Sequence, residues 1–546
     1  MPARDRWMTA ARTGRARLDA ERASGSVGRP AVVDSPQQPP PTTVSAGGAS
    51  GSVGASSSRS WRRNDPLRFP ALTAVLVCFA LAALSAAVLP TVPSYDPWSW
   101  IVWGREVVDP HLSFTVGGGP SWKPLPVIFT TVFALFGSAA PTLWVITARA
   151  GGVLALVAAW RLASRLVGGG RAGVCAGLIA VAGLLLTQDW FYYMFRGTSE
   201  PMLVAASLWA IDRLLDGRHG QAFVLGVAGA LIRPEWWPFL GLYGLWLWFK
   251  HPRLRWLVVA GLLSIPLLWF VPPWIGSGQP FLAASHAKDY NGHLGAHPLL
   301  EVLRRGVDLQ VLPALLAAVA AVAIGWFKYR DRVTLALGGA ALAWWVLVVG
   351  MTLDGYPGLE RFYLPAAGVT CVLAGVGITR VAQLAGAAMP GPRGRAVAVA
   401  VAVGAGLIAL SIPLTTNRIS DARATKAAAD QAVRTLDQLS DAVLAVGGHA
   451  GVFPCQSSFA AVNHGVQTAL AWKLHVTLSR VGTSMRAPGL DFIGPHNATD
   501  GAPARVDRRL TELTQIAQTG EWRVVRSTDP RVPALDSCVG HRVGNH

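Results

Sequence analysis

The stretch that decides the fold is PALTAVLVCFALAALSAAVLPTVPSYDPWSWIVWGRE, which runs from Pro70 to Glu106. Its first part, residues 70 to 92, is almost wholly apolar and long enough to cross a bilayer, which takes about 20 residues in a helix. Arg62, Arg63 and Arg68 precede it, and basic residues gather on the cytoplasmic side of membrane spans. We therefore expect a helix that crosses a membrane outward and opens into a polar, aromatic loop.

The whole chain has the composition of a membrane protein. Of its 546 residues, 52% are hydrophobic and 14% are charged, against about 25% charged in an average soluble protein. This composition argues against a soluble cytosolic enzyme. The net charge of +18 does not indicate nucleic-acid binding, because the basic residues of the middle region stand in short gaps between apolar runs.

Three regions follow from the composition. Residues 1 to 68 are rich in Arg, Pro, Gly and Ser and too poor in apolar surface to fold, so we expect a disordered, basic cytoplasmic tail. Residues 69 to 415 hold the apolar runs. In residues 416 to 546, helical spacing of apolar residues predicts a helix from Ile419 to Val446. Short apolar stretches at 451–453 and 522–525 then predict a small extracytoplasmic α/β domain.

Run lengths and loop charges predict an all-α polytopic membrane protein with about 11 transmembrane helices. Lys123 to Gly137 is apolar but short, and we interpret it as an interfacial or re-entrant helix, which places the all-basic loop after Trp160 in the cytoplasm. The first outside loop then covers residues 93 to 140, and the C-terminal region is extracytoplasmic. The predicted spans are 70–92, 141–160, 172–188, 200–215, 222–233, 236–249, 256–276, 311–327, 334–352, 362–383 and 396–415.

Asp96 is the first candidate for chemistry in the outside loops. Asp96 suits a helix N-cap and Pro97 the first helical turn, and Trp98 and Arg105 at helical spacing predict an amphipathic helix on the membrane surface. A carboxylate there is suited to act as a general base toward an acceptor hydroxyl or to help hold a divalent metal. A simple helix cap is the alternative.

Further charges in the outside loops suit a substrate cavity. Lys123 stands at the mouth of the interfacial helix, where it either meets a lipid phosphate or snorkels to water. Arg196 and Glu200 are spaced for a structural i,i+4 ion pair. Arg233-Pro234-Glu235 breaks two short apolar runs, and charges at membrane depth indicate a substrate cavity. The same loops hold the candidates Asp109 and His111.

The last two outside loops hold a histidine cluster and the candidate Arg361. His286, His293 and His297 could bind a metal, but their spacing matches no tight ligand motif. Arg361 stands at the outer end of a span, where a guanidinium can grip phosphate bidentately. Its alternative is an ion pair with a neighbouring acid such as Glu360 or Asp354.

Two of the five cysteines fall in the extracytoplasmic region. Cys455 and Cys538 can pair in an oxidising compartment, and two unrelated buried thiols are the alternative.

Taken in order, these motifs resemble the GT-C superfamily of polyprenyl-phosphate-sugar glycosyltransferases, especially its lipid A aminoarabinose transferase and protein O-mannosyltransferase branches. The resemblance covers about residues 70 to 415 and rests on order and spacing. It departs from the family at Asp96-Pro97, where many members have paired acids. The matching segments are Asp96, Lys123-Pro124-Leu125-Pro126, Leu135-Phe136-Gly137, Ser164-Arg165-Leu166-Val167-Gly168, Ser199-Glu200-Pro201-Met202, Arg233-Pro234-Glu235 and Arg361-Phe362-Tyr363-Leu364-Pro365.

The resemblance implies an inverting glycosyltransferase of a bacterial plasma membrane. Its donor would be a polyprenyl-phosphate-linked sugar, and its acceptor a cell-wall glycan, glycolipid or protein. The high Ala, Gly, Arg and Val content indicates a GC-rich genome such as that of an actinobacterium, which favours mannose or arabinose as the sugar. Lys123 and Arg361 would hold the lipid phosphate, and Asp96 would face the acceptor or a divalent cation such as Mg or Mn. The rival functions are a lipid-linked sugar flippase and a non-catalytic scaffold on the same fold.

Overall fold

The computed structural model describes residues 71–288, 297–455, 457–486, 488–495, 504–506 and 512–528. Residues 1 to 68, for which we predict a disordered tail, lie outside them. The helices are α2 (Ala71–Val88), α3 (Tyr95–Val108), α4 (Pro124–Ala134), α5 (Ala140–Leu166), α6 (Gly170–Leu185), α7 (Trp190–Phe195), α8 (Glu200–Leu215), α9 (His219–Ala230), α10 (Trp237–Lys250), α11 (Arg255–Ser277), α12 (Leu282–Lys288), α13 (Pro298–Asp308), α14 (Leu312–Ile324), α15 (Arg332–Leu353), α16 (Leu364–Ala387), α17 (Arg393–Ser411), α18 (Thr416–Ala445), α19 (Gly448–Val452) and α20 (Gln467–Lys473). The strands are β1 (Phe459–Val462), β2 (Val481–Gly482), β3 (Ser484–Met485), β4 (Gly489–Ile493), β5 (Arg505–Val506), β6 (Glu512–Thr519) and β7 (Trp522–Thr528).

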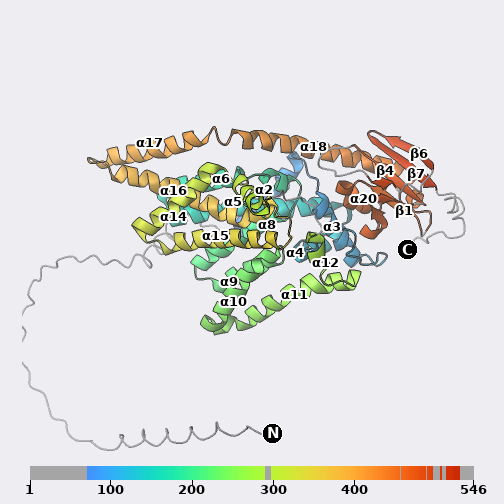
Figure 1. Ribbon diagram of the computed structural model, residues 1–546, viewed down its shortest axis with the longest axis horizontal. Helices are drawn as coiled ribbons and strands as arrows, with labels where there is room; N and C mark the ends of the chain where they lie inside the picture. The colour runs from blue at the N-terminus through green and yellow to red at the C-terminus, as the bar shows by residue number, and fades with distance from the viewer. Residues whose placement is uncertain are drawn as a thin grey trace, which may run out of the picture. The chain divides into compact units, whose positions relative to one another are not determined.

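The predicted membrane architecture is confirmed, and the chain is a multi-pass membrane protein. Each of the eleven predicted spans coincides with one helix, namely α2, α5, α6, α8, α9, α10, α11, α14, α15, α16 and α17 (Figure 1). Six helical segments in the described part of the chain are long and apolar enough to cross a membrane, among them Glu360–Ala387 and Arg393–Ser411. The predicted interfacial helix is α4, which has only 11 residues.

One predicted span is longer than its sequence pattern indicates. The apolar run ends at Trp160, but α5 continues to Leu166. Arg161 Nε lies 3.2 Å and Arg165 Nη1 3.3 Å from the carboxylate of Asp212 on α8, which packs along α5. These ion pairs allow two arginines to extend a helix beyond the end of its apolar pattern.

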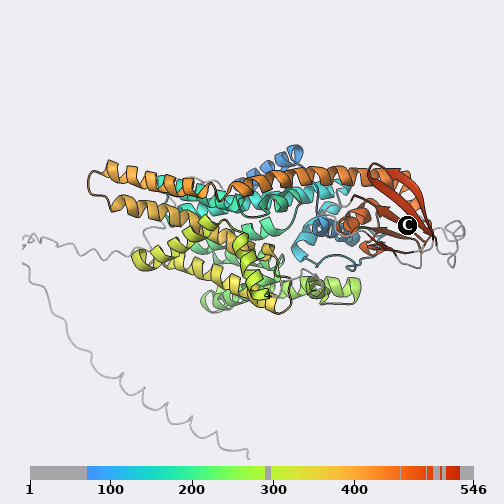
Figure 2. The same ribbon diagram turned by 45° about the horizontal axis from the view of Figure 1, so that its top comes forward.

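Helix α16 is the centre of the bundle, because every residue from Leu364 to Gly377 is buried. It contacts α5, α6, α8, α14, α15 and α17, and Figure 2 shows α17 running alongside it. Two glycines bring its neighbours close. A Cβ at Gly375 would collide with the carbonyl oxygen of Ala176 on α6, and a Cβ at Gly377 with that of Ala317 on α14.

Helix α3 corrects two expectations from the sequence. Its N-cap is Ser94, and Asp96 is the second helical residue, so Asp96 is not the cap. The helix also does not lie on a membrane surface, because every residue from Pro97 to Glu106 is buried. Its flanks contact α4, α5 and α20, which replace the membrane and the water that an amphipathic surface helix would face.

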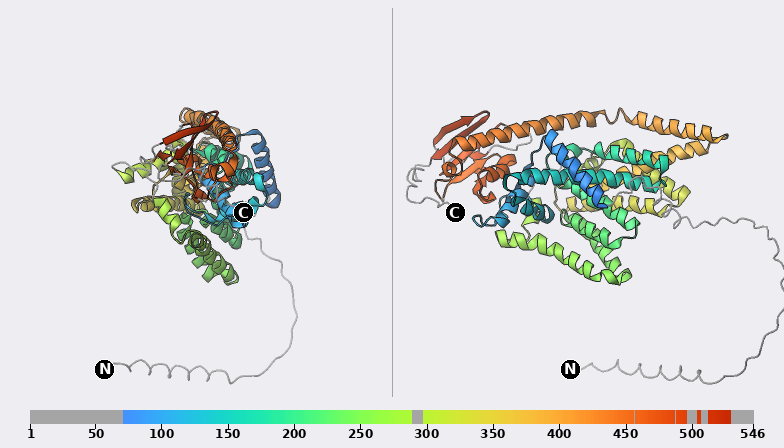
Figure 3. Two further views of the ribbon diagram at one scale, coloured as in Figure 1. Left: turned by 90° about the vertical axis from the view of Figure 1, so that its right-hand side faces the viewer. Right: turned by 180° about the vertical axis from the view of Figure 1, so that it is seen from behind.

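The C-terminal region is the predicted small α/β unit. Helix α18 begins at Thr416 rather than at the predicted Ile419, and it runs to the sheet, as Figure 1 and the right-hand view of Figure 3 show. The five-stranded sheet has the order β2-β1-β4-β7-β6, with β1 parallel to β2 and β4, and β7 antiparallel to β4 and β6. Trp522 to Val525 lies in β7 as the pattern suggests, whereas residues 451 and 452 belong to α19.

The two cysteines of this region differ in what the structure describes. Cys455 is buried just before β1. Cys538, its predicted disulfide partner, lies outside the described residues, so the disulfide stays a prediction.

The C-terminal region is joined to α3 by buried polar contacts. The Arg105 guanidinium donates hydrogen bonds to the carbonyl oxygens of Trp472 at 3.0 Å and Val476 at 2.9 Å. The Glu106 carboxylate accepts one from the backbone N–H of Leu478 at 3.2 Å. Because buried polar groups strongly favour their partners over an unpaired state, these bonds fix α20 against the helix that carries Asp96.

Candidate functional site

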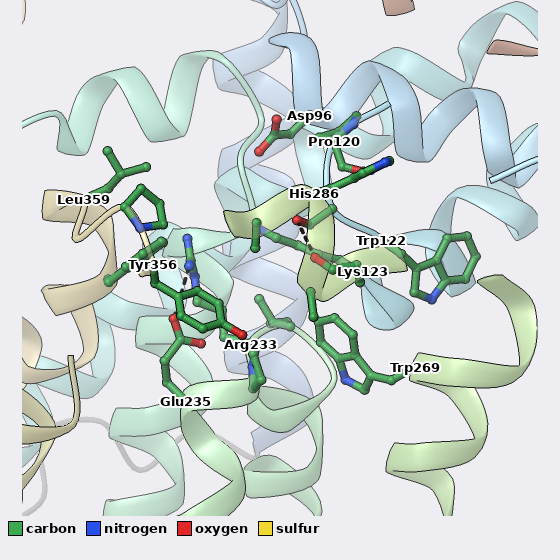
Figure 4. A pocket seen from close by; sticks show the side chains of 18 of the residues that line it. Asp96, Pro120, Trp122, Lys123, Arg233, Glu235, Trp269, His286, Tyr356 and Leu359 are labelled. Atoms are coloured by element: carbon green, nitrogen blue, oxygen red, sulfur yellow. Dashed lines mark hydrogen bonds and ion pairs between the residues drawn. The ribbon is translucent and has the colours of Figure 1, made fainter. Parts of the chain in front are cut away.

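A cavity of about 670 Å³ lies where the predicted outside loops meet. Its size is that of a small-molecule site. Figure 4 shows Asp96 at one end, with Arg233 and Glu235 toward the other. The lining comes from the start of α3, the segment before α4, the α9–α10 break, α11, α12, the α15–α16 connection and one residue of the C-terminal region. Its polar and aromatic members include Tyr95, Asp96, Trp122, Lys123, Arg233, Glu235, Trp237, Trp269, Phe270, Phe281, His286, Tyr356, Arg361, Phe362 and His464.

The predicted break between α9 and α10 is confirmed. Arg233 has extended backbone, with φ −145° and ψ 133°, as expected for a residue that precedes proline. The break places the Arg233 guanidinium 2.6 Å from Glu200 Oε1 and 3.4 Å from Glu235 Oε1. All three side chains are buried, so the break brings one cation and two carboxylates together at the floor of the cavity.

Lys123 is buried rather than snorkelling toward water. It is the N-cap residue of α4, and its Nζ lies 3.0 Å from Ser199 Oγ, 3.6 Å from Glu200 Oε1 and 5.0 Å from the ring centroid of Trp100. Glu200 therefore binds two cations, Lys123 and Arg233. Although Glu200 does not line the cavity itself, it fixes both positive charges from behind.

Arg361 forms an ion pair with Asp96, at 3.2 Å between Nη1 and Oδ2. The sequence suggested Glu360 or Asp354 as its acidic partner, and this suggestion is wrong. Asp354 pairs with Lys288 at 2.9 Å, and Glu360 lies 3.7 Å from Arg305. The start of α3 lies close to the residues before α16, so the partner of Arg361 is a residue 265 positions earlier in the chain.

The exposure of the charged groups indicates which of them can meet a ligand. The Arg361 side chain is 33% exposed and that of Asp96 is 22% exposed, against 10% for Lys123 and 6% for Arg233. Three cations and three carboxylates balance one another in and behind the cavity. An anionic ligand would add negative charge beside Arg361, with Lys123 close enough to contribute to its binding.

Three other predicted site residues do not line the cavity. Arg196 ends α7 and Glu200 begins α8, so the two share no helical face, and the predicted i,i+4 pair is wrong. Asp109 instead contacts the C-terminal region, with its Oδ2 2.9 Å from His475 Nε2. His111 follows it and donates its backbone N–H to Asp109 Oδ1.

The described part of the chain holds no group of side chains suited to bind a metal ion. No three His, Cys, Asp or Glu side chains come together there closely enough to hold one. His286 lines the cavity and His297 precedes α13, while His293 lies outside the described residues.

Sequence reasoning missed the pair formed by Tyr95 and His464. Their rings stack with centroids 4.3 Å apart and an interplanar angle of 30°. Burial, together with the neighbouring charge of Asp96, raises the pKa of Tyr95. No pattern in the sequence links the two residues, because the contact depends on how the C-terminal region packs against α3.

The arrangement of the helices is similar to that of ArnT from Cupriavidus metallidurans. The crystal structure of that protein bound to undecaprenyl phosphate matches with a TM-score of 0.50 and 14% identity, over 83% of this chain and 97% of that chain. The apo crystal structure matches with a TM-score of 0.51 and 16% identity, over 84% and 98%. No protein-family model and no curated protein matches the sequence. The chain therefore shares the overall fold of these two ArnT structures.

Proposed function

We propose that the protein is an inverting membrane glycosyltransferase that takes its sugar from a polyprenyl-phosphate-linked donor. The observation that carries the proposal is the cavity itself, where Arg361, Lys123 and Asp96 meet beside an aromatic wall that includes Trp122 and Trp269. Cations suit the phosphate, and aromatic side chains suit an apolar chain and a sugar ring. The likeness to a protein crystallised with undecaprenyl phosphate supports the same ligand class.

The reaction is a single displacement. Arg361 and Lys123 hold the donor phosphate, and an acceptor hydroxyl oriented or deprotonated by Asp96 attacks the anomeric carbon. The bond between that carbon and the phosphate oxygen breaks, and polyprenyl phosphate leaves with one more negative charge than the donor carried. The two cations stabilise this developing charge, which is where fixed positive groups accelerate such a reaction most.

The proposed setting is a bacterial plasma membrane with the N-terminus in the cytoplasm and the cavity and C-terminal region outside. In this orientation the donor enters from the outer leaflet, and the acceptor is a cell-wall glycan, a glycolipid or a protein. Arg233 and Glu235 form the polar floor of the site, and Glu200 positions Lys123 and Arg233. Membrane lipids are partners, and nucleic acid is not.

Transfer in reconstituted liposomes tests the proposal. The donors are radiolabelled polyprenyl-phosphate mannose and polyprenyl-phosphate arabinose, and octyl glycosides serve as hydroxyl acceptors. We expect wild type to form a labelled glycoside, and Asp96→Asn and Lys123→Ala to lower kcat/KM by about 100-fold or more, as removal of groups that act in the transition state does. Matched controls are Asp430→Asn and Lys426→Ala, an exposed ion pair on α18 that should leave transfer unchanged.

The outcomes separate the rival functions. Movement of labelled lipid between leaflets without glycoside formation would favour a flippase. Undiminished transfer by both cavity variants would refute the assignment of Asp96 and Lys123. Wild-type protein that binds undecaprenyl phosphate but transfers nothing from either donor would favour a non-catalytic scaffold.

A further inference from the structure

One residue of the C-terminal region reaches the proposed active site. His464 begins a short 3-10 helix, His464–Val466, between β1 and α20. Its side chain is exposed and lines the cavity beside Tyr95 and Asp96. No other residue of the C-terminal region in the described part of the chain lines this cavity.

The His464 ring stacks on Tyr95, and hydrogen bonds connect Tyr95 to the start of α20, which directly follows the His464 turn. The Tyr95 hydroxyl donates to Gln467 Oε1 at 3.2 Å, and the Thr468 hydroxyl donates to the Tyr95 carbonyl oxygen at 3.0 Å. Gln467 Nε2 donates in turn to the carbonyl oxygen of Gly118 at 3.1 Å, in the loop that rims the cavity. The imidazole therefore packs on a side chain that is itself hydrogen-bonded to the C-terminal region.

The electrostatic surroundings suit an imidazole that takes up a proton. Partial burial lowers the pKa of His464 below its ordinary value of 6.5, and the negative charge of Asp96 opposes that shift. The ring is therefore neutral near pH 7 and has a free nitrogen lone pair. The carboxylate of Asp96 would stabilise the imidazolium that forms when the ring gains a proton.

Asp96 alone is poorly placed to take the proton from the acceptor hydroxyl. Its Oδ2 accepts a hydrogen bond from Arg361 at 3.2 Å, and Arg361 is the cation to which we assign the donor phosphate. A carboxylate that holds the phosphate-binding arginine serves better to orient the acceptor than to carry its proton away.

We propose that His464 is the acceptor-side base of the glycosyl transfer, an inference that rests on the proposed function. The acceptor is a hydroxyl compound that enters between the rim loop and the C-terminal region. Its oxygen forms a bond to the anomeric carbon while the bond from that carbon to the phosphate oxygen breaks. The hydroxyl proton passes to a ring nitrogen of His464, and the electron pair of the broken bond leaves with polyprenyl phosphate.

The test compares His464→Ala and His464→Asn with wild type in the liposome transfer assay, with undecaprenyl phosphate binding measured in parallel. A general base typically contributes 10²–10⁴-fold, so we expect transfer to fall by about 100-fold or more. Undecaprenyl phosphate binding should remain as in wild type, because Arg361 and Lys123 are intact. Added imidazole should restore part of the activity of His464→Ala, because the truncated side chain leaves room for a free base.

His475→Asn is the matched control. His475 is 63% exposed, lies in the same region outside the cavity, and has φ +54°, a backbone conformation that asparagine tolerates. The His475→Asn variant should transfer the sugar at the wild-type rate.

Two results would overturn the inference while leaving the proposed function in place. The first is wild-type rates in His464→Ala. The second is a loss of transfer in His464→Ala that is accompanied by loss of undecaprenyl phosphate binding and is not relieved by imidazole. Absence of transfer by wild type itself would overturn the proposed function, and this inference with it.

Discussion

Arg361 and Asp96 stand 265 positions apart in the chain, and their side chains meet at 3.2 Å. The sequence identified both as charges in outside loops, which follows from their places beside apolar runs. It could not identify the partner of either one, because ion pairing depends on which loops the bundle brings together. For the same reason the sequence wrongly paired Arg196 with Glu200. The ion-pair partners of Glu200 are Arg233 and Lys123.

Asp491 on β4 carries a prediction about pH. It is 2% exposed, and its Oδ1 has no hydrogen-bond partner in the described residues. Burial raises its pKa from 3.8 to about 6. A carboxyl group whose pKa is raised in the folded state favours folding while protonated, so this contribution is lost as pH rises from about 4 to about 6.

We therefore expect Asp491→Asn to be more stable than wild type near pH 8, with a free energy of unfolding higher by about 2 kcal/mol and a higher unfolding temperature. The difference should shrink below about pH 6 and vanish near pH 4. Thermal unfolding in detergent at several pH values measures it, with Asp437→Asn, an exposed carboxylate on α18, as control. An equal gain at every pH would contradict the account.

At the scale of elements, apolar runs located the membrane helices because their lengths are set by the bilayer. For helix α3 the sequence pattern predicts the helix but not its surroundings. Its tryptophans and Arg105 have the pattern of a surface helix, yet α20 covers the face expected to meet the membrane, and Arg105 binds carbonyl oxygens there. A periodic pattern shows that a helix has different faces, but not what covers each of them.

Gly377 tests the packing of α16 against α14. Because a Cβ at this position would strike the carbonyl oxygen of Ala317, Gly377→Ala should force the helices apart and cost about 1–3 kcal/mol. Gly339 on α15 has open space around its would-be Cβ, and Gly339→Ala should stabilise the helix slightly, by up to about 1 kcal/mol. Thermal unfolding of both variants in detergent checks the contrast. Equal effects of the two substitutions would show that the close approach of α14 and α16 is not needed.

For the whole molecule, one cavity gathers segments from residues 95 to 464. Most of these segments lie in or beside loops that the positive-inside rule predicts on one side of the membrane, and their meeting agrees with that prediction. The opposite ends of the helices carry the basic residues, such as Arg253 between α10 and α11.

This orientation predicts a labelling pattern in intact cells. A cysteine at Lys426 on α18 should react with a membrane-impermeant maleimide, because we place α18 outside. A cysteine at Arg253 should react only after the cells are opened. Labelling is compared with wild type to subtract the native cysteines, and the reverse pattern would show that the topology is inverted.

The sequence by itself determined the membrane class, the places of the eleven apolar helices, the short helix α4 and the charged residues Asp96, Lys123, Arg233, Glu235 and Arg361. These follow from local quantities, namely the length of apolar runs and the sign of flanking charges. The tertiary structure alone decided the burial of α3, the partner of each charge and the entry of His464 into the cavity. Each of these depends on contacts between segments that lie tens to hundreds of residues apart, and such contacts leave no periodic trace in a single sequence.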